Sequence, residues 1–445
     1  MTVDPARRVA AELVLAVEKD AAYSNLLLPR MLRERRLSPT DAAFATELGY
    51  GTLRWQGVLD CVIADAAKRD IGTLELPVRA VLRVGAYQLL HTRVPPHAAV
   101  STTVDLSKVV AGHRPAGLVN AVMRKISQRD WSGWVAALAP TDPVGRLAFE
   151  RGYPDWVAVA LLDALDGDLS ELGQALAFDR PTTHLLARPG AIDRDQLLVE
   201  AGAQASAGPF SPYAVHLAGG DPGTIAAVRD GRARVQDEGS QLVAMALSSA
   251  PIEGSNRWWL DTCAGPGGKA SLLAGLLPPD ARLVAGELQP HRAALVRAGV
   301  RGTATSVIVA DAARPAWRTE AFDRVLVDAP CSGLGALRRR PEVRWRRKPE
   351  DVERLVQLQR QLLDSAASST RPGGVICYAT CSPHLAETWH VVDSVAASRG
   401  DLELIDARGL LPGVPELGVG PTVQLWPHRH GTDAMFIALL RRVAT

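Results

Sequence analysis

The sequence predicts a multidomain protein with an N-terminal all-α bundle, a small α+β middle subdomain and a C-terminal α/β domain built on a doubly wound, mainly parallel sheet. Apolar residues recur at three- and four-residue spacing through residues 5–128. Short β-like pieces appear within 183–235, and strands then alternate with helices from Val235 onward. A chain of 445 residues is long enough for two or three domains. We place their boundaries at 1–140, 141–234 and 235–445.

The N-terminal region has the apolar spacing of packed helices, for example at Val9, Leu13 and Val17. The pair Pro95-Pro96 interrupts this pattern before a new helix near Ala98. A last helix ends in the basic turn Arg124-Lys125. Because the region has neither a glycine-rich turn nor an acid/base cluster, its basic turns are either solvated faces or an RNA surface.

The residue composition and the expected secondary structure change twice in the middle of the chain. Tryptophans and prolines amid short helical stretches mark residues 131–180 as a connector. Short strands are then expected at His184–Ala187 and Ala214–Leu217, around a helix near Arg194–Ala201. This pattern predicts the small α+β subdomain.

The C-terminal region alternates apolar strands with helical spacers, which is typical of βαβ units. The expected strands are Trp258–Leu260, Leu283–Ala285, Val307–Ala310, Val325–Val327, Val375–Tyr378 and Met435–Leu440. In such sheets, ligands bind in the crevice beyond the carboxyl ends of the strands. Residues that directly follow these strands are therefore the candidates for chemistry.

Composition excludes several classes of protein. Seven charged residues among the first twenty exclude the apolar core of a signal peptide, and no run approaches the roughly 18 apolar residues of a membrane helix. The five cysteines include no CxxC pair, which argues against a disulfide framework and a metal site. We expect a cytoplasmic protein without metal or membrane contact, acting as a monomer.

A glycine-rich turn, Asp261-Thr262-Cys263-Ala264-Gly265-Pro266-Gly267-Gly268-Lys269, follows the first of these strands and opens a helix. Such glycines let the backbone approach a ligand, and the helix N-terminus favours partial negative charge. The turn is not a P-loop, because Cys263 replaces the first glycine and Ala270 follows the lysine. Glu287 and Asp311 end the next two strands, where carboxylates can bind ribose hydroxyls. The turn therefore allows an adenosine-containing cofactor, either NAD(P) or S-adenosylmethionine, and the alternative is a purely structural glycine turn.

Two thiols stand where strands give way to loops, at Cys331 and Cys381. Each precedes a serine, whereas Cys377 lies inside a strand and is expected to be a buried hydrophobic residue. Asp328 ends the strand before Cys331 and can pair with an amide-like ring nitrogen. Two thiols, a carboxylate and an adenosine cofactor suit methylation of a pyrimidine at C5. That reaction needs thiolate attack at C6, charge stabilisation on the ring and later release of the thiol.

A basic run, RRRPEVRWRRK at residues 338–348, begins seven residues after Cys331 and carries a local net charge of +6. Clustered arginines around Trp345 suit phosphate contact and base stacking, although a solvated charged loop is the simpler interpretation. We favour nucleic-acid contact because the run adjoins the site in sequence. The expected RNA-binding residues are Arg338, Arg339, Arg340, Arg344 and Arg347.

Several motifs together resemble the bacterial 16S ribosomal RNA cytosine-5 methyltransferases of the RsmB (Fmu/Sun) type. In the C-terminal region they are DTCAGPGGK at 261–269, VDAPCSGLGALRRRPEVRW at 327–345 and YATCSPHLAE at 378–387. In the N-terminal region, ELGYGTLRW at 47–55, GAYQLLHTRVPPHAAV at 85–100 and GLVNAVMRK at 117–125 resemble a NusB-like helical RNA-binding domain. VQDEGSQLVA at 235–244 resembles the entry into a Rossmann-like catalytic domain.

The resemblance implies an enzyme that methylates C5 of a cytosine in 16S ribosomal RNA, free or partly assembled. It implies Cys381 of the Thr-Cys motif as nucleophile, Cys331 of the Pro-Cys motif in product release, and Asp328 beside them. Because DNA cytosine methyltransferases use the Pro-Cys thiol as nucleophile, the Thr-Cys motif indicates RNA. The S-adenosylmethionine site would comprise Cys263, Ala264, Gly265, Pro266, Gly267, Gly268, Lys269, Glu287, Asp311 and Asp328. Gly265 and Glu287 differ mildly from the usual Ala and Asp of this family.

Two other functions fit parts of the sequence. The spacing Gly265-x-Gly267-x-x-Ala270 is compatible with a nicotinamide-dependent oxidoreductase, but that function leaves both thiols and the basic run unexplained. The helical region is also compatible with a non-catalytic RNA-binding assembly factor.

Overall fold

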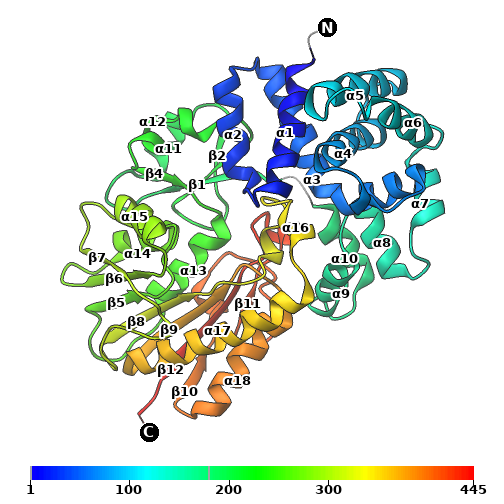
Figure 1. Cartoon of the computed structure of the whole chain (residues 1–445). Helices are drawn as coiled ribbons and strands as arrows, with labels where there is room; N and C mark the ends of the chain where they lie inside the picture. Colours follow the sequence, from blue (N-terminus) through cyan, green and yellow to red (C-terminus); the bar gives the residue numbers. More distant parts are fainter. Residues whose placement is uncertain (1–2, 179–180, 445) are drawn as a thin grey trace. The chain divides into compact units, whose positions relative to one another are not determined.

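The computed structural model describes residues 3–178 and 181–444, which form two compact units (Figure 1). One unit comprises Met1–Ala177 together with Leu337–Lys348, and the other comprises Phe178–Ala336 with Pro349–Thr445. The architecture confirms the predicted fold class of a helical N-terminal domain and a C-terminal sheet domain covered by helices. Within the described residues, no helix combines the length and apolar character that crossing a membrane requires.

The first unit is entirely helical. Its helices are α1 (Pro5–Lys19), α2 (Ser24–Arg35), α3 (Pro39–Ala67), α4 (Leu76–His91), α5 (Pro96–Val110), α6 (Ala116–Ile126), α7 (Trp131–Leu138), α8 (Pro143–Arg151), α9 (Asp155–Asp163) and α10 (Leu169–Ala177), with a 3₁₀ turn at Ile71–Thr73. The periodic residues Val9, Leu13 and Val17 all lie in its core, as their spacing predicted. The expected connector is therefore largely helical and belongs to this unit.

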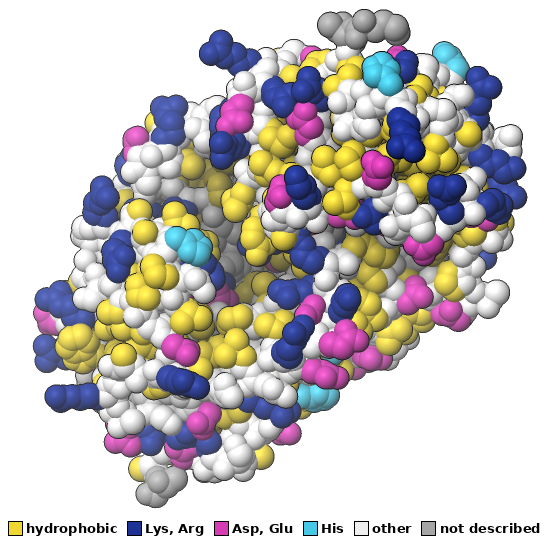
Figure 2. Space-filling view, in the orientation of Figure 1, with side chains coloured by type: hydrophobic (Ala, Val, Ile, Leu, Met, Phe, Trp, Pro, Cys, Tyr) yellow, Lys and Arg dark blue, Asp and Glu magenta, His cyan; other side chains and the backbone are white. Residues whose placement is uncertain are grey.

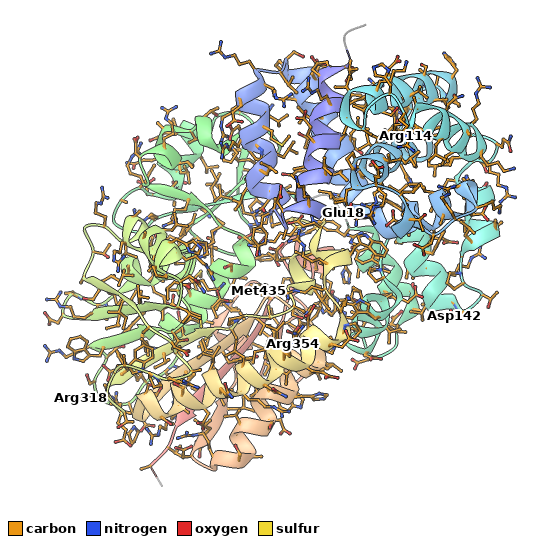
Figure 3. The ribbon with its side chains drawn as sticks, in the orientation of Figure 1. Glu18, Arg114, Asp142, Arg318, Arg354 and Met435 are labelled. Atoms are coloured by element: carbon orange, nitrogen blue, oxygen red, sulfur yellow. The ribbon has the colours of Figure 1, made fainter. Side chains whose placement is uncertain are left out.

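A buried ion-pair group crosses the core of the helical bundle. Arg83 of α4 is 2% exposed and donates to Asp60 at 2.7 Å and to Glu18 at 2.6 Å. Glu18 lies near the end of α1 (Figure 3). Burial opposes the charge on Arg83, but the two carboxylates outweigh it and raise the pKa of the guanidinium. The arginine thus joins α1, α3 and α4 through charge-assisted hydrogen bonds.

The basic run packs into this helical unit, where it forms the short helix α16 (Val343–Arg346). Glu342 accepts a hydrogen bond from the Ser24 hydroxyl at 2.5 Å. The Arg344 guanidinium stacks over the Tyr153 ring at 3.5 Å, and Trp345 donates to the Arg54 carbonyl at 2.8 Å. The segment is therefore part of the core of the helical unit.

The second unit contains two sheets. The smaller is antiparallel, with strand order β2-β3-β1-β4. Its elements are β1 (Thr183–Ala187), α11 (Arg194–Ala201), β2 (Ala205–Ala207), β3 (Ala214–Leu217), a 3₁₀ turn (Pro222–Thr224), α12 (Ala226–Arg229) and β4 (Ala233–Val235). The two expected strands and the helix are confirmed, whereas β2 and β4 are additional three-residue strands.

The larger sheet has the strand order β10-β12-β9-β8-β5-β6-β7, with β11 paired to β12. Its strands are β5 (Trp258–Asp261), β6 (Arg282–Glu287), β7 (Thr305–Val309), β8 (Phe322–Asp328), β9 (Thr370–Thr380), β10 (Leu402–Ile405), β11 (Val423–Gln424) and β12 (Phe436–Arg442). The strands from β7 to β9 pair in parallel, whereas β10, β11 and β12 are antiparallel to their neighbours. The part of the sheet that carries the glycine-rich turn, from β9 to β7 in the strand order, is therefore parallel.

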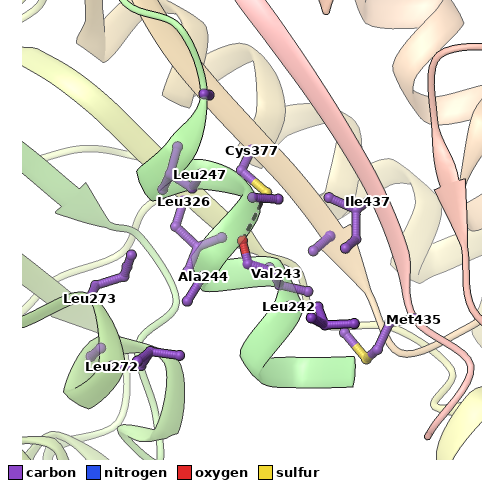
Figure 4. Packing of buried hydrophobic residues seen from close by; sticks show 14 of the residues in the cluster. Leu242, Val243, Ala244, Leu247, Leu272, Leu273, Leu326, Cys377, Met435 and Ile437 are labelled. Carbon is purple, nitrogen blue, oxygen red and sulfur yellow. Dashed lines mark hydrogen bonds between the residues drawn. The ribbon is translucent and has the colours of Figure 1, made fainter. Parts of the chain in front are cut away.

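Helices cover both faces of this sheet, which explains its continuous apolar strands. They are α13 (Glu238–Ser249), α14 (Gly268–Leu276), α15 (Pro290–Gly299), α17 (Pro349–Ser369), α18 (Trp389–Arg399) and α19 (Pro427–His430), with 3₁₀ turns at Leu334–Ala336, Leu385–Glu387 and Arg408–Leu410. Consecutive residues of one strand enter different cores: Leu326 packs with α13, and Val325 packs with α17. Figure 4 shows the first core, where Leu326 and Cys377 face Leu242 to Leu247.

Gly57 on α3 gives a test of how the basic run packs. A Cβ atom at Gly57 would lie 2.2 Å from the Trp345 ring, so the substitution Gly57→Ala must displace a rigid side chain. We expect it to destabilise the helical unit by about 1–3 kcal/mol in chemical unfolding. Gly117→Ala on α6 is the matched control because nothing lies near its Cβ position, and it should be neutral or gain up to about 1 kcal/mol. Equal stability of the two variants would contradict the packing of α16.

Candidate active site

Three predicted motifs meet at one edge of the large sheet. The glycine-rich turn follows β5, the Cys331 loop follows β8 and the Cys381 loop follows β9. Strand β8 lies between β5 and β9, and parallel pairing places Asp261 beside Leu326 and Asp328 beside Ala379. The carboxyl ends of all three strands therefore face the same crevice. This is also where the order of the sheet reverses, the usual ligand position in such folds.

The two candidate thiols are neighbours. The Sγ atoms of Cys331 and Cys381 lie 3.4 Å apart, both residues are partly exposed, and neither cysteine forms a disulfide. Cys377 is fully buried in the sheet, as expected from its place within a strand. Because sulfur atoms this close can exchange a proton, the pair has the geometry for cooperative acid/base and nucleophilic chemistry.

Lys269 has a different position from the one its place in the glycine-rich turn suggested. It begins the first turn of α14, and its Nζ donates to Asp328 Oδ2 at 2.9 Å. Burial lowers the pKa of Lys269, but the charge and hydrogen bond of Asp328, followed by the charge of Cys381, outweigh burial and raise it. The ammonium is therefore held charged by the carboxylate, and the charge of Cys381 adds to this effect. A cation in this position favours the thiolate form of Cys381.

The glycine-rich turn and the carboxylates beyond it fit an adenosine-containing cofactor. Gly267 has a φ of +106°, and a Cβ atom at Gly265 would lie 2.1 Å from Glu287 Oε2. Glu287 accepts from the Gly265 amide at 3.0 Å and is 4% exposed, whereas Asp311 is exposed just beyond β7. Glycine at 265 thus lets the backbone lie directly against the Glu287 carboxylate, and glycine at 267 permits the left-handed turn. Carboxylates at both strand ends match the hydroxyl and amine donors of an adenosine group.

A buried acid lies at the base of this turn. Asp261 ends β5, is 0% exposed and accepts from the Cys263 amide at 3.3 Å. Burial, followed by the charge of Asp328, raises the pKa of Asp261 to about 8. Asp261 is therefore largely protonated at neutral pH. The sequence places Asp261 in the turn but did not predict a role for its side chain.

Sequence reasoning also missed the hydrogen bonds beneath the thiols. Glu387, from the end of the motif YATCSPHLAE, is 0% exposed and accepts from the amide of Ser332 at 2.7 Å. The available signal was an acidic residue six positions after Cys381, inside a motif already considered functional. Nothing in the sequence showed that its side chain points back under Cys331.

The structure corrects the predicted RNA-binding role of two arginines. Arg338 is 5% exposed and Arg344 is 0% exposed, so neither presents its guanidinium to phosphates as expected. Arg344 binds the Gly152 carbonyl at 2.9 Å in addition to the Tyr153 ring. Of the others, Arg339 and Arg347 are partly exposed and Arg340 is exposed. Figure 2 shows Lys and Arg side chains interspersed with Asp and Glu over the face in view.

Comparison with known families gives two matches along the chain. Residues 247–441 match the family described as 16S rRNA methyltransferase RsmB/F, and residues 4–128 match the NusB family. A Mycobacterium tuberculosis protein that carries only the general description of a methyltransferase is 53% identical over 448 residues, covering 99% of this chain and 97% of its own. Ribosomal RNA small subunit methyltransferase B of Pseudomonas syringae pv. tomato is 33% identical over 448 residues, covering 98% and 97%.

Solved structures share the fold at low sequence identity. The crystal structure of PH0851 aligns with a TM-score of 0.84 and 22% identity, covering 99% of this chain and 100% of that one. NSun6 from Pyrococcus horikoshii, solved with SFG, aligns with a TM-score of 0.55 and 18% identity, covering 66% and 99%. At these identities the likeness concerns the fold.

Differences in the surroundings of the cysteines predict the order in which the thiols react. Burial raises the pKa of Cys263 to about 12 and raises that of Cys377 further. At about pH 8, iodoacetamide should therefore modify Cys381 and spare Cys263 and Cys377. Tandem mass spectrometry of digested protein can distinguish these sites. All five cysteines should react in the unfolded control, and equally fast labelling of Cys377 in folded protein would contradict the site.

Proposed function

Because the chain belongs to the RsmB/F family of ribosomal RNA methyltransferases, as its motifs predicted, we propose that it transfers a methyl group to C5 of a cytosine in 16S ribosomal RNA. The observation that carries the proposal is the 3.4 Å separation of the Cys331 and Cys381 sulfurs beside the Lys269–Asp328 pair. Methylation at an exocyclic nitrogen or a ribose hydroxyl has no use for a second thiol.

The cofactor of the proposed reaction is S-adenosylmethionine, which supplies the methyl group when bound. The glycine-rich turn from Cys263 to Gly268, with Glu287 and Asp311, would hold it. Lys269 belongs with the substrate because its ammonium is directed to Asp328. We therefore move Lys269 from the cofactor-binding set to the group that acts on the cytosine, together with Asp328.

The first step is attack of the Cys381 thiolate on C6 of the cytosine. A carbon–sulfur bond forms, and the electron pair of the C5–C6 double bond moves toward C5 and N3, so that negative charge develops on the ring. A carboxylate alone only accepts hydrogen bonds, and N3 needs a donor. The proton shared by Lys269 and Asp328 supplies that donor at the place where charge develops.

The second thiol, Cys331, assists cleavage of the bond between C6 and the Cys381 sulfur. After C5 has gained the methyl group, loss of the C5 proton to solvent re-forms the double bond and breaks the bond between C6 and the Cys381 sulfur. The hydrogen bond with Cys381, followed by burial, holds the pKa of Cys331 well above its usual value. Cys331 therefore stays protonated, does not compete as nucleophile and can give its proton to the departing sulfur at 3.4 Å. Both thiols must stay reduced, which supports a cytoplasmic location.

Bisulfite sequencing of 16S ribosomal RNA tests this function. RNA from cells without the protein should lose protection at one cytosine or more, and purified protein with S-adenosylmethionine should restore it. An identical protection pattern with and without the protein would contradict the proposal.

Removal of the nucleophile should abolish the reaction. Cys381→Ala should reduce methyl transfer to background because no C6 adduct can form, while cofactor binding persists. Transfer of labelled methyl groups to 16S ribosomal RNA measures the first property and calorimetric titration the second. Cys61→Ala in the helical unit is the control. Near-normal turnover of the Cys381 variant would show that another group attacks.

Removal of the second thiol should stall the reaction after methylation. Cys331→Ala should accumulate a covalent RNA–protein complex, seen as a slow band on denaturing gels, because the leaving sulfur lacks its proton donor. The double variant Cys331→Ala with Cys381→Ala should form no such band. Absence of the band from the single variant would exclude Cys331 from release.

A further inference from the structure

The residues that directly follow the two thiols are bonded to each other. Ser332 Oγ and Ser382 Oγ lie 3.1 Å apart, and the two residues are 1% and 0% exposed. One serine belongs to the loop after β8 and the other to the loop after β9. Their bond therefore joins the two cysteine loops immediately beside the sulfur atoms.

The buried carboxylate of Glu387 binds Ser332, one of the two bonded serines. Glu387 Oε1 accepts from the Ser332 amide at 2.7 Å and from Gln359 Nε2 at 3.1 Å, and Oε2 accepts from the Ser332 hydroxyl. Gln359 of α17 also donates to the Pro330 carbonyl at 2.9 Å. Four hydrogen bonds thus fix the backbone on both sides of Cys331.

The position of Glu387 is itself fixed by the sheet. Its carbonyl accepts from the Tyr378 hydroxyl at 2.7 Å, and Tyr378 is fully buried in β9. Among the ion pairs of the described residues, none includes Glu387, so hydrogen bonds alone compensate for burial of this carboxylate. A buried carboxylate without a cation is costly to keep, and it imposes a local negative field on its neighbours.

The charge of Glu387 acts on Cys331. Glu387 is one of the charges that raise the pKa of Cys331, after the Cys381 hydrogen bond, burial and the Cys381 charge. On the other side, the charge of Cys381 acts on Lys269. The carboxylate charge of Glu387 therefore acts on Cys331, and the charge of Cys381 acts on the Lys269 ammonium.

We propose that Glu387 is a positioning residue that fixes the two thiols in register through Ser332 and Ser382 and keeps Cys331 as the proton-carrying member of the pair. This inference rests on the proposed function for its role in turnover, but its effect on the thiols exists without RNA. A residue that merely stabilises the fold would change neither the pH at which Cys331 reacts nor the rate at which the two sulfurs join.

Glu387→Gln separates charge from hydrogen bonding. Glutamine keeps an acceptor for the Ser332 amide but removes the negative charge. We expect the pH profile of Cys331 alkylation to move to lower pH, with a faster reaction below the midpoint, because one of the charges that raise its pKa is removed. Glu353→Gln on exposed α17 surface is the matched control and should leave the profile unchanged. A profile equal to that of the wild type in folded Glu387→Gln protein would overturn the charge role.

Ser382→Ala tests the relative position of the two thiols without changing Glu387. It replaces the first test if the Glu387→Gln protein does not fold. Loss of the 3.1 Å bond should slow diamide-driven disulfide formation between Cys331 and Cys381. With RNA, a larger fraction of protein should remain as covalent complex. Unchanged rates of disulfide formation would contradict the junction. Alkylation and disulfide rates test this inference, whereas methyl transfer by wild-type protein tests the function, so the two failures are distinguishable.

Discussion

The parallel pairing of β8 with β9 is the constraint on which the site depends. It sets Asp328 beside Ala379, so the loops that leave both strands begin at the same level and bring two sulfurs to 3.4 Å. Side chains alternate between faces along a strand, so a slip of one residue would turn Asp328 away from its present neighbours. Apolar packing on both faces fixes this register, since Leu326 and Cys377 enter one core while Val325 and Ile376 enter the other.

Opposite charges on the two sides give the sulfurs different tasks. Lys269, held by Asp328, places a cation near Cys381, and Glu387 places an anion near Cys331. In the proposed reaction, identical side chains act as an attacking thiolate and as a proton donor because their surroundings differ. The same separation of roles by environment distinguishes pairs of carboxylates in other enzymes.

Much of this catalytic domain was predictable from the sequence, for physical reasons that particular residues show. The runs Val325–Val327 and Val375–Tyr378 are continuously apolar because both faces of the sheet are covered, and the chemistry follows directly after them. Pairing between strands was not predictable, so the separation of the thiols was unknown. Strands β2, β4 and β11 are too short to show a periodicity.

The missed and mistaken residues share one cause. Charged side chains are read as exposed when only the sequence is known, but Arg344 is buried against Tyr153 and Glu387 is buried under Ser332. Lys269 ends a glycine-rich turn, and from the start of α14 it binds Asp328, a partner that the sequence did not show. In each case the partner lies more than 50 positions away along the chain.

The most direct measurement identifies the cysteine that bonds to RNA. Ribosomal RNA containing 5-fluorocytidine traps the adduct because fluorine at C5 cannot leave as a proton would. Wild-type protein with S-adenosylmethionine should then yield one nucleotide-bearing peptide, which tandem mass spectrometry assigns to Cys381. Attachment at Cys331, or no covalent peptide at all from active protein, would contradict the account.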